Sequence, residues 1–172
     1  VKFEYENKVK FEPGRRMVLT ANHSGWFALD GMVAGELIWN DLYKCYLDST
    51  GKEEERDGRK IFSAVVHDAL INSPVAKMFP SAMRREAMIG RKEYNNLLAN
   101  KDDDNLPYYT GIFPESEAGS TKSFLQAYKL KEFKTGFLRN ALLADADILV
   151  MTITGNEELM PSLCSIKVEN KS

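Results

Sequence analysis

The chain has 172 residues, of which 44% are apolar and 28% are charged, values typical of a globular protein and far from those of a disordered one. That length suits one domain with one substantial core. Lys and Arg number 23 against 25 Asp and Glu, so no overall positive field would attract a nucleic-acid backbone. The composition therefore predicts a single folded domain over residues 1–172 and argues against nucleic acid as a partner.

Cysteine usage and hydropathy limit the expected location. Cys45 and Cys164 are the only cysteines, too few to staple a secreted scaffold and not at metal-ligand spacing, so a reducing, cytoplasmic compartment is expected. No run approaches the roughly 18 consecutive apolar residues of a membrane span, and no charged-then-apolar leader is evident. Because the first residue is Val1 and not Met, we expect an excised or processed piece whose missing ends carried any anchor.

Hydrophobic periodicity predicts alternating strands and helices along the chain. An N-terminal hairpin is predicted over residues 1–11, then a strand at Met17–Thr20 and a helix from about Phe27 to Trp39. Charge-rich segments at 48–60 and 101–105 are predicted to be solvated loops. Further strands are predicted at Tyr43–Leu47, Pro107–Phe113 and Ile148–Ile153, and further helices at Ile61–Ile71, Ser123–Lys131 and Gly136–Ala144. This interleaving favours an α/β fold whose central sheet is mostly parallel and flanked by helices.

A histidine and an aspartate follow the first buried strand. His23 comes directly after it and Asp30 stands seven residues later. In one continuous helix the two would be about 10 Å apart along the axis, far beyond a hydrogen bond of about 3 Å, so the chain must turn between them, which Gly25 permits. Asp30 would then fix the tautomer of His23 and support its imidazolium in general-base catalysis. Alternatively, His23 only ends a strand and Asp30 is a carboxylate on a helix face.

The segment 113–122 (FPESEAGSTK) follows another predicted strand, where open α/β sheets place their ligands. Its backbone amides and Lys122 would suit a phosphate, and Glu115 would suit a hydroxyl or a neighbouring arginine. An ordinary strand-to-helix loop explains the same residues equally well.

The densest basic stretch surrounds an apolar Met-Ile pair, and its arginines suit phosphate oxygens better than lysines do. For any single one of these residues a solvated rim is the simpler interpretation. His67 lies in the apolar segment VVHDALI and is expected to be a packed or surface histidine, not a second base. The basic residues are Arg84, Arg85, Arg91 and Lys92.

Together these segments resemble the phospholipid/glycerol acyltransferase family, which includes the lysophosphatidate acyltransferases, from about Met17 to Glu157. NHSGWFALDG is similar to the family's first block, which implies a general base at His23 and its orienting carboxylate at Asp30. Six residues separate the two, as in one branch of the family, where most members have four. IGRKEYNNLL is similar to the second block, in which an arginine lies just before a helix, and Arg91 is the best match.

The third block of the family, usually Phe-Pro-Glu-Gly, resembles FPESEAGSTK, which implies that Glu115 is the acceptor-binding glutamate. Ser116 replaces the usual glycine and leaves the identity of the acceptor open, because its side chain narrows the phosphate approach. The fourth block resembles FKTGFLRNALLADADILVMTITGNEE, although Val150-Met151-Thr152 stand where the family usually has Val-Pro-Val.

The resemblance implies an O-acyltransferase that moves a fatty acyl group from acyl-CoA or acyl-carrier protein to a hydroxyl of a glycerolipid-type acceptor such as lysophosphatidate. It implies substrate contacts at Arg91, Glu115, Ser116 and Lys122, peripheral contact with a membrane, and no cofactor or metal besides the thioester co-substrate. The absence of a Gly-x-Ser-x-Gly elbow favours direct transfer in a ternary complex. Two alternatives stay open, a catalytically silent phospholipid-binding module and a thioesterase-like hydrolase.

Overall fold

A single parallel sheet forms the centre of the computed structural model, which describes residues 14–23, 29–51, 58–71, 88–100 and 104–159. Its strand order is β3-β2-β4-β1-β5, and every neighbouring pair is parallel. This confirms the predicted α/β fold with a parallel central sheet. The strands are β1 (Met17–Ala21), β2 (Phe62–Val66), β3 (Met88–Gly90), β4 (Tyr109–Ile112) and β5 (Asp147–Met151).

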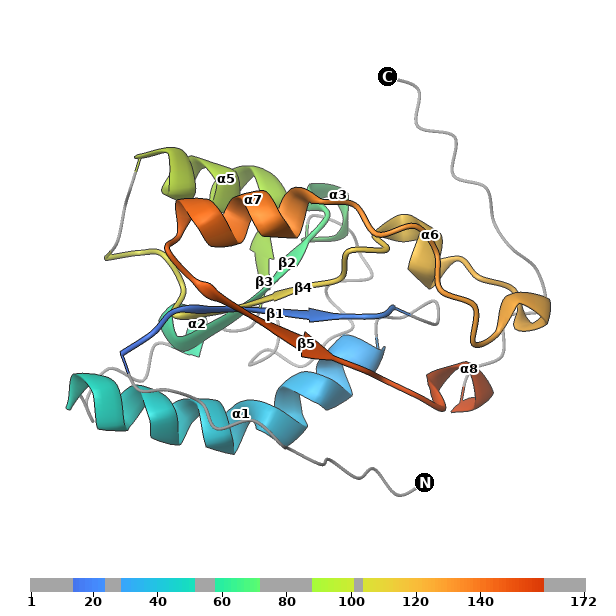
Figure 1. Ribbon diagram of the computed structural model, residues 1–172, viewed down its shortest axis with the longest axis horizontal. Coiled ribbons are helices and arrows are strands. Elements are labelled where there is room, and N and C mark those ends of the chain that lie inside the picture. The colour runs from blue at the N-terminus through green and yellow to red at the C-terminus, as the bar shows by residue number, and fades with distance from the viewer. Residues whose placement is uncertain (1–13, 24–28, 52–57, 72–87, 101–103, 160–172) are drawn as a thin grey trace.

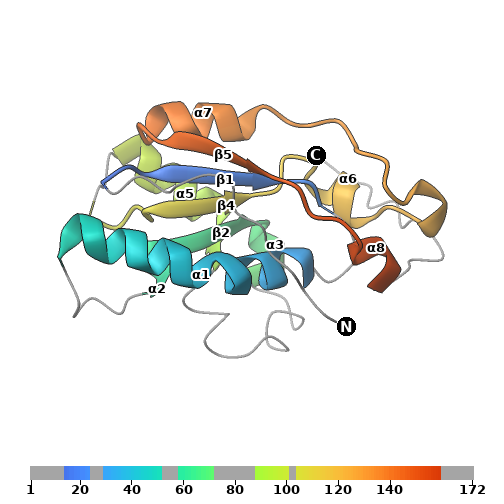
Figure 2. The same cartoon turned by 60° about the horizontal axis from the view of Figure 1, so that its bottom comes forward.

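Helices cover both faces of the sheet, as a parallel sheet requires. The long helix α1 (Leu29–Thr50) lies on one face, and α5 (Arg91–Asn100) and α7 (Gly136–Leu143) lie on the other (Figures 1 and 2). None of the helices in the described ranges is both long and apolar enough to cross a bilayer. The short elements are α2 (Gly58–Ile61), α3 (Asp68–Ile71), α6 (Glu117–Ser120), the 3-10 turn η2 (Phe124–Gln126) and α8 (Asn156–Leu159).

Two hydrophobic clusters hold these layers together, one on each face of the sheet. Beneath α1, Leu19 of β1 packs with Leu42 and Tyr46 of the helix. On the other face, Ile89 of β3 packs with Tyr94 of α5 and further buried residues. Successive residues of a strand point to opposite faces, so β2 and β4 contribute to both clusters, through Phe62 and Tyr109 on one face and Val65 and Ile112 on the other.

The predicted strand Tyr43–Leu47 is wrong, because these residues lie inside α1, which also runs well past the predicted helix end at Trp39. Among the side chains of this helix that the structure describes, those of Ile38, Leu42, Cys45 and Tyr46 are buried. Their spacing of four, three and one residues is that of one helical face. The local alternation of apolar and polar residues was therefore part of a helical pattern that began earlier in the chain.

The predicted helix Ile61–Ile71 is also wrong, because its centre is the strand β2, with α2 and α3 at its ends. β2 lies between β3 and β4 and is hydrogen-bonded to both. A short apolar run cannot be assigned to strand or helix from its periodicity alone. Pairing on both sides decides for the strand, and the β-branched Val65 and Val66 suit it.

The predicted helix Ser123–Lys131 is reduced to the 3-10 turn η2, and Leu125 within it is 87% exposed. The predictions for β1, β4, α7 and β5 are confirmed to within a few residues. The charged segment 48–60 is partly helical, since its ends belong to α1 and α2, whereas Asp104 and Asn105 form a turn as predicted. The predicted N-terminal hairpin lies outside the described residues.

Candidate active site

His23 lies just beyond the C-terminal end of β1, at the sheet edge where α6 and α8 also lie (Figure 1). The residue is 8% exposed, and its ring stacks on Phe113 with the ring centroids 4.4 Å apart. Its backbone N–H donates a 2.9 Å hydrogen bond to Oε1 of Glu115. Thr20 of β1 pairs with Ile112 of β4, so His23 and Glu115 each stand three residues past paired positions. The parallel register therefore brings them together.

Glu115 is completely buried, and both of its carboxylate oxygens have donors inside the protein. Besides the hydrogen bond from His23, Oε2 accepts one of 2.8 Å from the backbone N–H of Lys131 and lies 3.4 Å from Nζ of Lys122. The sequence pattern assigned this glutamate to an acceptor hydroxyl. The structure places its oxygens on the backbone that carries His23 and on a buried ammonium group.

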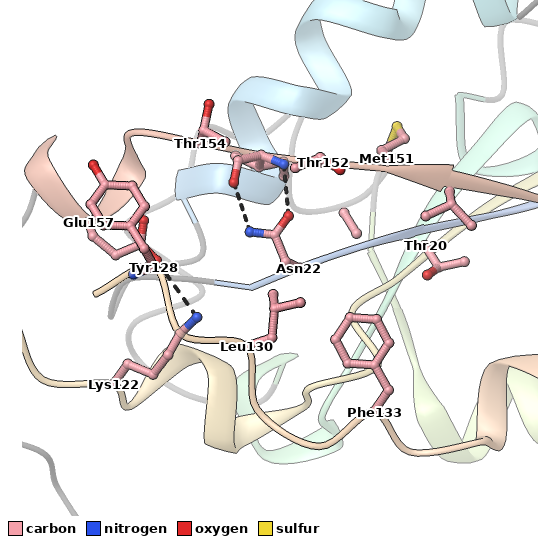
Figure 3. A pocket seen from close by; sticks show the side chains of 13 residues that line it. Thr20, Asn22, Lys122, Tyr128, Leu130, Phe133, Met151, Thr152, Thr154 and Glu157 are labelled. Atoms are coloured by element: carbon pink, nitrogen blue, oxygen red, sulfur yellow. Dashed lines mark hydrogen bonds and ion pairs between the residues drawn. The ribbon is translucent and has the colours of Figure 1, made fainter. Parts of the chain in front are cut away.

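Lys122 joins Glu115 to a second buried carboxylate, that of Glu157 in α8. The Lys122 side chain is 2% exposed, and its Nζ lies 3.7 Å from Oε1 of Glu157 and donates to the backbone carbonyl of Lys129 at 3.2 Å. Figure 3 shows Lys122 pointing toward Glu157. Sequence reasoning did not find Glu157, since an acidic residue in the first turn of a short helix is an ordinary helix-start feature.

Asn22, immediately before His23, clamps the end of the neighbouring strand. Its Nδ2 donates to the carbonyl of Ile153 at 2.7 Å, and its Oδ1 accepts from the N–H of Ile153 at 2.8 Å (Figure 3). This side chain thus extends the β1–β5 pairing past Met151, where the backbone ladder ends. The fixed backbone on which His23 sits is held from one side by Asn22 and from the other by Glu115. The only sequence signal for this role was the Asn-His pair itself.

A cavity of about 360 Å³ adjoins this network on the β5 side (Figure 3). Its walls combine apolar side chains with the polar groups of Asn22, Lys122 and Glu157. Tyr128 stands at it as well, and its hydroxyl donates a hydrogen bond to Glu158, which raises the pKa of Tyr128. The apolar lining residues are Ala21, Leu130, Phe133, Val150, Met151 and Ile153.

The loop after Glu115 has an unusual backbone. Ser116 has φ 54° and ψ −147°, a region that is essentially restricted to glycine. The glycine expected here from the family pattern is therefore the residue that the backbone itself favours. Ser116 is partly buried and its side chain makes no capping hydrogen bond to α6.

Arg91 is the first residue of α5 and follows the C-terminal end of β3. All strands are parallel, so Arg91 lies at the same edge of the sheet as His23 and Glu115. However, β2 and β4 stand between β3 and β1, a separation of three strand spacings or about 14 Å. Arg91 is exposed, while the N–H of Lys92 donates to Asp68 at 3.2 Å. The structure therefore brings Glu115, but not Arg91, against His23.

Four further residues from the sequence analysis are Asp30, Arg84, Arg85 and His67. Asp30 lies in the first turn of α1, but its side chain and residues 24–28 are outside the described part of the chain, as are Arg84 and Arg85. His67 is not in a helix as predicted. It is exposed between β2 and α3, with Nε2 3.6 Å from a carboxylate oxygen of Glu117.

Comparison with known proteins identifies the family to which the chain is similar. The chain matches the family model described as "Acyltransferase" over residues 2–154. Among curated proteins it is similar to an uncharacterized protein of Mycobacterium leprae (26% identical over 154 residues, 88% of this chain and 36% of the relative). Uncharacterized proteins of Mycobacterium bovis and Mycobacterium tuberculosis are 26% identical over 152 residues, which is 88% of this chain and 37% of each relative.

The chain thus spans little more than a third of the length of these relatives. No solved structure matches it significantly. The family model covers nearly the whole chain, and the described parallel α/β fold agrees with an acyltransferase domain. The chain therefore belongs to the acyltransferase family that contains glycerolipid acyltransferases such as the lysophosphatidate acyltransferases.

Proposed function

We propose that the chain is an O-acyltransferase that moves a fatty acyl group from an acyl thioester to a hydroxyl of a glycerolipid-type acceptor, with His23 as general base. The observation that supports this role most directly is the fixed position of His23. A histidine at the C-terminal edge of a parallel sheet, with its backbone bonded to Glu115 and its ring stacked on Phe113, is held in one orientation. Such fixed orientation is what proton transfer within a bound complex needs.

In the proposed reaction, His23 removes the proton of the acceptor hydroxyl while the oxygen attacks the carbonyl carbon of the thioester. The tetrahedral intermediate then collapses, its C–S bond breaks, and the imidazolium returns the proton to the leaving thiolate. The products are an ester and a free thiol, so no covalent acyl-enzyme is required. Asp30 is proposed to orient the imidazole and to stabilise its charged form. The donor is acyl-CoA or acyl-carrier protein, and the chemistry needs no other cofactor.

For the acceptor, we propose that Arg91 contacts the phosphate and that Ser116 lies along the acceptor path. Arg91 is exposed at the correct sheet edge, and its planar guanidinium suits phosphate oxygens. Lys122 and Glu115 are different, because their charged groups already bind one another and the backbone. We therefore assign these two residues to support of His23 in place of direct substrate contact.

We also propose that the protein contacts a membrane peripherally, through the residues at the mouth of the cavity. Tyr128, Leu130 and Phe133 line the cavity and are 58%, 65% and 40% exposed. Exposed Lys129 and Lys134 stand among them. Apolar side chains interleaved with lysines suit the boundary between acyl chains and anionic headgroups. Co-sedimentation with anionic vesicles, compared with neutral vesicles, tests this contact.

The experiment that tests the proposed function measures acyl-thioester consumption with and without an alcohol acceptor. Consumption that depends on lysophosphatidate, with formation of the acylated lipid, is the expected result. Consumption at the same rate without any acceptor would instead identify a thioesterase-like hydrolase. Binding of lysophospholipid without any consumption would identify a silent lipid-binding module, and either of these results would reject the transferase.

A further inference from the structure

The proposed function gives Lys122 only a general supporting role and gives Glu157 none. Together with Glu115 they form a buried group of one ammonium and two carboxylates, which is called here the charged triad. Each of the three residues is at most 8% exposed. Burying a charge is costly unless it is paired and hydrogen-bonded. A sequence that needed only stability at this position could fill it with apolar side chains, so the triad points to a positional role.

The contacts of the triad show what it positions. Glu115 binds the backbone N–H of His23 through Oε1 and the backbone N–H of Lys131 through Oε2. Lys122 bridges Glu115 to Glu157 at 3.4 and 3.7 Å. Glu115 lies between β4 and α6, Lys122 follows α6 and Glu157 belongs to α8, so these contacts join three segments to the end of β1. The three segments contribute the side chains, and the end of β1 contributes the backbone of the proposed base.

The geometry of Glu115 explains why Lys122 and Glu157 matter. A carboxylate can rotate its oxygens between donors, and Glu115 has donors on three sides, two from the backbone and one from Lys122. Lys122 has no freedom to leave, because the Glu157 carboxylate and the Lys129 carbonyl hold its ammonium group. We propose that Lys122 and Glu157 are positioning residues for His23, acting through Glu115. This inference rests on the proposed role of His23 as the base.

The test uses Glu157→Gln, which keeps the size of the side chain and removes its charge, and Lys122→Met. The matched control is Glu158→Gln, since Glu158 is the next residue of α8, is exposed and bonds the hydroxyl of Tyr128 instead of the triad. In the transferase assay, both triad variants should lower kcat by about 10- to 100-fold with the KM for the thioester unchanged. The Glu158→Gln control should keep wild-type kcat.

A second readout does not depend on activity. Amide hydrogen exchange of His23 is measured, and the other histidine of the chain, the exposed His67, is the reference in the same spectra. In the triad variants the His23 amide should exchange at least about tenfold faster, while exchange at His67 and in the strand β2 stays as in the wild type. A merely structural triad would instead raise exchange across the whole chain.

The outcomes separate this inference from the proposed function. Unchanged kcat and unchanged His23 exchange in folded Glu157→Gln and Lys122→Met would overturn the positioning role even if the wild type is an active transferase. Faster exchange confined to His23 in a wild-type background that transfers no acyl group would support the positioning role and reject the transferase.

Discussion

Gly119 of α6 packs directly against His23: a Cβ added at Gly119 would stand 2.8 Å from the Cβ atom of His23 and 2.8 Å from that of Glu115. Carbon atoms do not approach so closely without displacing one another. The proposed base and its supporting carboxylate can therefore share one small space only because residue 119 has no side chain.

The variant Gly119→Ala should be both less stable and less active. Overpacking of a close contact typically costs about 1–3 kcal/mol, and the atoms that must move belong to His23 and Glu115. Denaturant unfolding and the transferase rate measure the two effects. Gly136→Ala is the control, because a Cβ there would meet nothing within 4 Å, and it should leave both quantities near wild type. Equal behaviour of the two variants would contradict the packing argument.

His23→Ala should lower the transfer rate by about 10²–10⁴-fold, the usual cost of losing a general base. The backbone N–H that binds Glu115 is retained in this variant, so the fold should persist, which circular dichroism can verify. Asp30→Asn should also lower the rate, since it removes the charge that supports the imidazolium. His67→Ala serves as the control and should stay active. Normal turnover in folded His23→Ala would reject the mechanism.

Arg91→Glu should raise the KM for a phosphate-bearing acceptor by at least about tenfold and leave the KM for the thioester unchanged, because a hydrogen bond to a charged group contributes about 1.5–3 kcal/mol. Lys92→Glu makes the same charge change at the neighbouring exposed position and should have a smaller effect. Steady-state kinetics with varied acceptor give both values. An acceptor KM that does not respond to Arg91→Glu would exclude the phosphate contact.

Ser116→Gly should stabilise the protein by about 1 kcal/mol. The residue has φ 54° and ψ −147°, where a side chain causes strain of about 1–3 kcal/mol that glycine avoids, although glycine loses part of the gain through its more flexible unfolded chain. Ser120→Gly, within α6, should destabilise instead, since it removes a hydrogen bond to the Glu117 carbonyl. The midpoints of urea unfolding measure both changes in stability. A destabilised Ser116→Gly would show that the backbone at residue 116 is not strained.

Tyr109→Phe should make the fold more resistant to alkali. Burial raises the pKa of Tyr109, and the Cys45 thiol beside it acts in the same direction. A raised folded-state pKa means that stability is complete below the unfolded value of about 10 and is lost as the pH rises above it. Between about pH 9 and about pH 11, the free energy of unfolding should therefore fall less for the variant than for the wild type.

At neutral pH the same change should cost little, because the group beside the buried Tyr109 hydroxyl is the Cys45 thiol, which is only a weak hydrogen-bonding group. Tyr94→Phe offers the contrast. Burial also raises the pKa of Tyr94, but its hydroxyl is hydrogen-bonded to Thr110, so its loss should cost about 1 kcal/mol at pH 7. Equal losses for the two variants at neutral pH would contradict this difference.

The sequence alone determined the fold class and the place of the proposed base. A run of apolar residues predicts a buried strand such as Met17–Ala21, and a helical spacing of apolar residues predicts a helix such as Gly136–Leu143. Both patterns involve residues only a few positions apart in the sequence. The order of the blocks around His23, Arg91 and Glu115 likewise predicted one common sheet edge, since all three follow strands that prove to be parallel.

The tertiary structure alone decided the state of Phe62–Val66 and the partners of Glu115. The first became a strand because β3 and β4 pair with it on both sides, which outweighs a local pattern that fits a helix equally well. The Glu115 carboxylate points into the protein because the register of β1 with β4 brings it to the backbone N–H of His23, which lies 92 positions away in the chain. The link from Lys122 to Glu157 likewise joins distant segments. No local period encodes such contacts, since they exist only after the sheet has assembled.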